Sequence, residues 1–177
     1  ISEALYWLGR SYAESAEYTK AVQHFEDALD RFDDDPQAQS IDAILNAYQK
    51  LYPRVIQNRP QVPKDFTSWV EMRTQAALRN QRLTRYARLQ NFRAKKKLDS
   101  TKNTTADAPL MLVHHKVPIE RQPPITLGSV GLCLAKRGYR SAQKYFDYLL
   151  SKYPESPERG AAYYGQARLA YTRDKDP

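Results

Sequence analysis

The stretch that decides the fold runs from Ser2 to Pro36 and reads SEALYWLGRSYAESAEYTKAVQHFEDALDRFDDDP. Its apolar and small residues recur at steps of three and four on both sides of a short polar break, residues 14–17. This spacing places them on one face of each of two helices. Three small residues allow the helices to approach closely and three aromatic residues fill the space between them: Gly9, Ala21 and Ala28, with Tyr12, Tyr18 and Phe25. The stretch therefore predicts an antiparallel helix pair.

This predicted pair resembles the tetratricopeptide repeat (TPR), a helix–turn–helix unit of about 34 residues. The family's signature positions fall on Leu5, Leu8, Gly9, Tyr12, Ala21, Phe25, Ala28 and Asp33. Asp33 is the one departure, because the family closes its repeat with proline. The resemblance implies stacked helix pairs with a concave groove, lined by the first helix of each pair, that binds a protein or peptide.

Similar helices flank the middle of the chain. The apolar stripe from Pro36 to Tyr52 predicts a further first helix, which Pro53 is expected to end. Near the other end, Gly138-Tyr139 and Phe146 indicate a second helix pair. Its first helix, about 127–136, departs from the family, since Ser129 and Val130 stand where Leu and Gly are usual. One more helix is expected after Ser156 and Pro157, a cap and a first-turn proline.

The fold class is therefore predicted to be all-α, a TPR-like solenoid of antiparallel helix pairs interrupted by an insert. The predicted organisation is a first part, 1–52, a Pro-rich insert, 53–124, and a last part, 125–177. The net charges of these parts are −6, +10 and +4. Within the insert, helical periodicity predicts one long helix over about 65–98 and a flexible loop over about 99–109. The apolar run 110–117 is expected to be an extended segment or a short helical turn.

Basic side chains dominate the second half of the predicted long helix and are its candidate binding residues: Arg79, Arg82, Arg85, Arg88, Arg93, Lys95, Lys96 and Lys97. The first four step by three and predict a slowly turning stripe. A solvated helix face is the simplest interpretation. An acidic protein surface is the next, ahead of the phosphates of nucleic acid or an anionic membrane surface, because no nucleic-acid motif is present.

The TPR resemblance places a second set of candidate binding residues on the groove-facing side of the first helix: Glu3, Tyr6, Trp7, Arg10 and Glu14. Tyr6 and Trp7 are the best anchors, since aromatic side chains dominate contact energy at interfaces. The Lys and Asn residues with which some family members clamp a chaperone's carboxyl terminus are replaced here by Trp7 and Arg10. We therefore expect a different partner.

Catalytic, cofactor and metal motifs are not predicted. His114 and His115 are adjacent and lack further ligands at suitable spacing. Cys133, the one cysteine of the chain, falls at a helix-packing position and is expected to be buried. No nucleotide, nucleophile or zinc motif occurs, and no apolar run reaches the length of about 18 residues that a membrane span needs. We expect a non-catalytic protein without a cofactor.

The compartment is suggested by resemblance alone. The segment KYPESPERGAAYYGQARLAY, residues 152–171, is similar to bacterial extracytoplasmic TPR proteins. This likeness implies the bacterial periplasm or cell envelope. Since Ile1 begins the sequence, we also expect a fragment or a processed chain.

Overall fold

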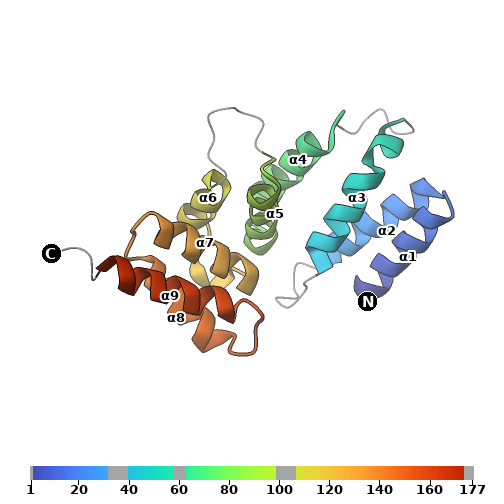
Figure 1. Ribbon diagram of the computed structural model, residues 1–177. Helices are drawn as coiled ribbons and strands as arrows, with labels where there is room; N and C mark the ends of the chain where they lie inside the picture. Colours follow the sequence, from blue (N-terminus) through green and yellow to red (C-terminus); the bar gives the residue numbers. More distant parts are fainter. Residues whose placement is uncertain (1, 32–39, 58–62, 99–106, 174–177) are drawn as a thin grey trace. The chain divides into compact units, whose positions relative to one another are not determined.

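The computed structural model describes residues 2–31, 40–57, 63–98 and 107–173. Over these ranges the chain is all-helical, without a strand, as predicted (Figure 1). The helices are α1 (Ser2–Glu14), α2 (Tyr18–Arg31), α3 (Ser40–Ile56), α4 (Phe66–Arg79), α5 (Leu83–Lys96), α6 (Ala108–Lys116), α7 (Pro124–Lys136), α8 (Ala142–Lys152) and α9 (Arg159–Arg173). The chain divides into two compact units, Ile1–Ala76 and Ala77–Pro177, and each is described by itself. We call them unit 1 and unit 2.

In unit 1, α1 and α2 form the predicted helix pair. Gly9 lies against the ring of Phe25, where a Cβ atom would come within 2.6 Å of the ring. The turn between the helices closes with a hydrogen bond from the Glu17 N–H to the Tyr12 carbonyl, 2.9 Å long. Phe25 is fully buried, together with Ala21, Val22 and Ala28. The close approach therefore depends on glycine at position 9.

The next pair of elements, α3 and α4, is joined by aromatic rings. Tyr48 and Trp69 meet edge to face at 4.7 Å, and Phe66 and Trp69 stack at 5.6 Å. The prediction that Pro53 ends the preceding helix is wrong, because α3 continues to Ile56. Pro53 removes one backbone hydrogen bond, but the last turn buries Val55, which favours continuation of the helix.

The prediction of a single helix over 65–98 is wrong. α4 ends at Arg79 and α5 begins at Leu83. Between them Gln81 takes a left-handed conformation with φ of 56°, and the Arg82 N–H donates to the Ala77 carbonyl at 2.9 Å. The break contains neither Gly nor Pro. However, residues 79–82 read RNQR and offer no apolar side chain to bury, so no packing energy holds this turn in a helix.

The apolar run 110–117 lies mostly in α6, a helix of nine residues. Leu110 and Val113 are buried, and α6 packs on α5 and α7. Residues 99–106, which make up most of the loop predicted over 99–109, lie outside the described residues. The end of that loop is helical instead, because Ala108 and Pro109 form the first turn of α6. The predicted insert is thus shared between the units: α4 packs on α3, and α5 and α6 pack on α7.

At the end of the chain, α7, α8 and α9 pack successively around Phe146. A Cβ atom at Gly131 of α7 would lie 2.5 Å from this ring, and one at Gly165 of α9 would overlap it. Gly131 thus occupies the signature glycine position, one residue later than the predicted Val130. The separation from glycine to phenylalanine is 15 residues here and 16 in the first pair. With this register, the apolar face of α7 follows the family pattern through its buried Leu127, Val130 and Leu134.

Candidate functional site

The exposed face of α1 carries the groove residues predicted from the sequence. Trp7 is 54% exposed, which is unusual for so large an apolar side chain. Arg10 and Glu14 are exposed on the same face, and Tyr6 is half-buried beside them. Glu3 begins this face in the first turn of α1, but its side chain lies outside the described part of the structure. We call the surface formed by Tyr6, Trp7, Arg10 and Glu14 the α1 face.

Each side chain of the α1 face contacts the next one along the helix. The ring of Tyr6 lies 5.3 Å from that of Trp7 and 6.3 Å from that of Phe25, which ties Tyr6 to the core. The guanidinium of Arg10 lies 5.2 Å from the centre of the Trp7 ring. It also forms an ion pair with Glu14, with a nitrogen–oxygen distance of 3.4 Å. Helical spacings of three and four residues produce this arrangement.

The geometry of the α1 face suits contact with a peptide. Trp7 is held on one side by Tyr6 and on another by Arg10, so little side-chain freedom is lost when a ligand covers it. The Arg10–Glu14 pair is exposed, and such pairs contribute only about 0–1 kcal/mol. Arg10 can therefore exchange Glu14 for a carboxylate of a ligand at small cost. The surface offers one apolar contact next to one cation.

The basic residues predicted to form a stripe do not share one exposed surface. Arg79 ends α4, Arg82 lies in the turn, and Arg88 of α5 is only 4% exposed. Arg88 is buried because α5 is enclosed along residues 86–92. Arg85 and Arg93 are half-buried, whereas Lys95, Lys96 and Lys97 are exposed at the end of α5. The prediction of a continuous row from Arg79 to Arg88 is therefore wrong. The exposed members of the set fall into two groups, one at Arg79 and Arg82 and one at residues 95–97.

Groups that often mark catalysis or metal binding have other roles here. Cys133 is buried as predicted, and burial raises the pKa of its thiol, which disfavours a reactive thiolate. His114 and His115 lie on α6, and the Nδ1 atom of His114 is 2.8 Å from the hydroxyl of Tyr145. In the part of the chain that the structure describes, no group of three or more His, Cys, Asp or Glu residues could hold a metal ion. None of its helices is long and apolar enough to cross a bilayer.

Comparison with known proteins identifies the first helix pair. Residues 3–35 match the family model of the tetratricopeptide repeat. No curated protein and no solved structure gives a significant match to the chain. The matched residues cover most of α1 and α2, and the described remainder continues as packed helices. The chain is thus a TPR-like helical repeat protein, and repeats of this family generally serve as scaffolds that bind other proteins.

Proposed function

We propose that the chain is a non-catalytic scaffold module that binds a protein or peptide through the α1 face and the neighbouring Glu3. The supporting observation is Trp7, which is 54% exposed in the repeat that matches the TPR family and is braced by Tyr6 and Arg10. A peptide with an apolar side chain next to a carboxylate would satisfy Trp7 and Arg10 together. Such aromatic and arginine side chains carry much of the binding energy at interfaces.

The test selects ligands first and then removes the anchors. Peptides are selected from a random display library against the wild-type chain, and their affinities are measured by fluorescence anisotropy. Changing Tyr6 and Trp7 together to Ala should lower affinity at least about tenfold, since hot-spot side chains contribute about 2 kcal/mol or more. Met72→Ala is the matched control, because Met72 is 44% exposed in the same unit but lies on α4.

The two tryptophans of the chain supply an independent readout. Trp7 is exposed, whereas Trp69 is 2% exposed in the aromatic cluster of α3 and α4. In a Trp69→Phe variant, Trp7 is the one remaining indole, and its emission should shift to shorter wavelength when a peptide covers it. Selected peptides that bind the Tyr6/Trp7 double variant as tightly as the wild type, at unchanged helical content, would show that the α1 face is not the site.

A second candidate function rests on the charges of the two units. Unit 1 contains eight Lys and Arg against twelve Asp and Glu, whereas unit 2 contains twenty against eight. This excess favours an anionic partner for unit 2. An acidic protein ranks ahead of nucleic acid or an anionic membrane because the sequence contains no nucleic-acid motif. Salt distinguishes the candidates, because phosphate binding weakens steeply along a log–log line as salt rises. Binding to the α1 face should depend on salt much less.

A further inference from the structure

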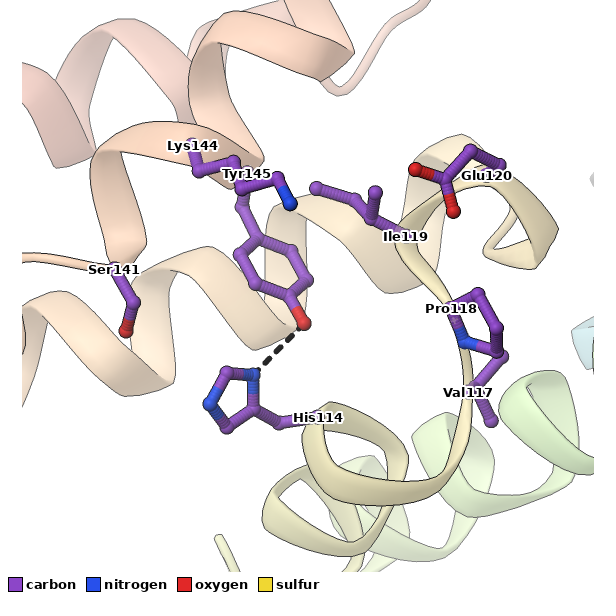
Figure 2. Close-up of a pocket in the computed structure, with 8 residues that line it drawn as sticks. All are labelled: His114, Val117, Pro118, Ile119, Glu120, Ser141, Lys144 and Tyr145. Carbon is purple, nitrogen blue, oxygen red and sulfur yellow. Dashed lines mark hydrogen bonds between the residues drawn. The ribbon is translucent and has the colours of Figure 1, made fainter.

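A pocket in unit 2 brings together residues that lie far apart in the sequence (Figure 2). The end of α6, the 3₁₀ turn Ile119–Arg121 and the start of α8 line a space of about 350 Å³ that is open to solvent on one side. Its polar lining is His114, Glu120, Ser141, Lys144 and Tyr145, and its apolar lining is Val117, Pro118 and Ile119. We call it the α6–α8 pocket. Small-ligand sites have this mixture of apolar walls and a few convergent polar groups.

The walls of the α6–α8 pocket are fixed by buried hydrogen bonds. Gln122, which is 1% exposed, donates from Nε2 to the Val117 carbonyl at 2.9 Å and to the Tyr145 hydroxyl at 3.4 Å. One buried amide thus connects the segment after α6 to α8. His114 joins the same network through Tyr145. The pocket is therefore largely formed before any ligand enters, which lowers the entropy cost of binding.

The hydrogen bond to Tyr145 fixes the orientation of the His114 ring. The Tyr145 hydroxyl accepts from Gln122 Nε2 and still has a hydrogen and a second lone pair, so its contact with His114 Nδ1 fits either neutral tautomer. The other ring nitrogen of His114, Nε2, is turned away from Tyr145 (Figure 2). The ring therefore forms a fixed wall of the pocket.

The sequence around the α6–α8 pocket carries a positive net charge. From residue 107 to residue 147 it contains six Lys and Arg residues against three acidic residues, Asp107, Glu120 and Asp147. Asp107 forms an ion pair with Arg137 at 3.6 Å, and Asp147 accepts hydrogen bonds from Gln143 and Gln166. Lys144 lies in the pocket itself, while His115 and Lys116 are exposed at the end of α6. The summed field therefore favours an anionic ligand, with Glu120 as the one opposing charge in the lining.

We propose that the α6–α8 pocket binds a carboxylate side chain of an acidic peptide, with Lys144 contacting the carboxylate and Pro118 and Ile119 contacting its methylene groups. A hydrogen bond between an ammonium and a carboxylate is charge-assisted and therefore stronger than a neutral one. The volume leaves room for a carboxylate side chain together with part of the peptide that carries it. This site lies in unit 2, is separate from the α1 face of unit 1, and does not depend on the function proposed for that face.

Two opposite charge changes test the sign of the ligand. The probe is fluorescein-labelled octaglutamate, and its dissociation constant for the full chain is measured by anisotropy. Lys144→Gln should weaken binding about fivefold, the upper range for an exposed ion pair. Glu120→Gln should strengthen binding, about twofold, by removing the repulsion. Lys152→Gln is the matched control, since Lys152 is exposed on the same helix, eight residues or about 12 Å further along it. It should change binding by less than about twofold.

Other outcomes would overturn the proposal. Equal losses for Lys144→Gln and Lys152→Gln would mean diffuse attraction to a basic surface rather than a pocket. Weaker binding of octaglutamate by the Glu120→Gln variant would mean that the pocket does not hold an anion. A single-stranded oligonucleotide that binds more tightly than octaglutamate and loses affinity on Lys144→Gln would assign the pocket to nucleic acid instead. All of the substituted side chains are exposed, so circular dichroism should show unchanged folding.

Discussion

At the scale of single residues, Tyr52 shows how one hydroxyl makes unit 1 sensitive to alkaline pH. The side chain is 2% exposed, and its hydroxyl donates to the Pro63 carbonyl at 2.6 Å. Burial, followed by the charges of Asp65 and Glu26, raises its pKa from 10.0 to about 12. Since the folded pKa lies above the unfolded one, the contribution of Tyr52 to stability is complete below pH 10. It is lost as the pH rises from 10 towards 12.

Tyr52→Phe should therefore lower the free energy of unfolding at pH 7 by about 1 kcal/mol, the usual loss for one hydrogen bond. It should also reduce the further loss of stability between pH 10 and pH 12. Urea unfolding followed by the fluorescence of Trp69, which packs 6.4 Å from Tyr52, measures both effects. Tyr139→Phe serves as control, because Tyr139 is 47% exposed in unit 2. An alkaline loss of equal size in the wild type and in Tyr52→Phe would contradict this assignment.

At the scale of elements, α9 contains two glycines with opposite surroundings. A Cβ atom at Gly165 would overlap the ring of Phe146, whereas nothing lies within 4 Å of the corresponding position at Gly160. Gly165→Ala should destabilise the packing of α8 and α9 by about 2 kcal/mol through steric overlap. Gly160→Ala should stabilise the helix by about 0.5 kcal/mol, because alanine loses less backbone entropy. Thermal unfolding followed by circular dichroism compares the two variants, and equal shifts would show that Phe146 simply moves aside.

The sequence predicts elements well where a periodic apolar face is long. The α1–α2 pair follows from the spacing of Gly9, Phe25 and their neighbours alone, and the groove residues could be placed on α1 through the TPR resemblance. Breaks are harder to predict, because the turn near Gln81 has no Gly or Pro and depends on the lack of apolar side chains in residues 79–82. The burial of Arg88 depends on which helices surround α5, which local periodicity does not contain.

The α6–α8 pocket could not be predicted for a related reason. His114 and Tyr145 are 31 residues apart, and only the packing of α6 beside α8 brings them into contact. The sequence did single out His114, as half of the one His pair in the chain. It contained no periodic or motif signal for Glu120 or Lys144, and Tyr145 was predicted only as part of the apolar pattern of the second helix of the last pair. A pocket assembled from three elements requires tertiary structure for its recognition.

At the scale of the whole molecule, each unit contains its own core. Phe25, Tyr48 and Trp69 are buried in unit 1, and Phe92 and Phe146 are buried in unit 2. The net charges, −4 and +12, also differ between the units. Separate cores are the condition under which parts of a chain unfold as separate cooperative units.

Both tryptophans, Trp7 and Trp69, lie in unit 1, so fluorescence follows that unit while far-ultraviolet circular dichroism follows both. We expect the two signals to give different urea midpoints. Gly165→Ala, a change within unit 2, should lower the midpoint of the dichroism transition and leave that of fluorescence unchanged. Val70→Ala, at a fully buried position in unit 1, should lower the fluorescence midpoint, because truncating a core side chain costs about 1 kcal/mol or more. Fluorescence and dichroism midpoints that coincide, and that move together in both variants, would instead mean that the two cores unfold in one cooperative transition.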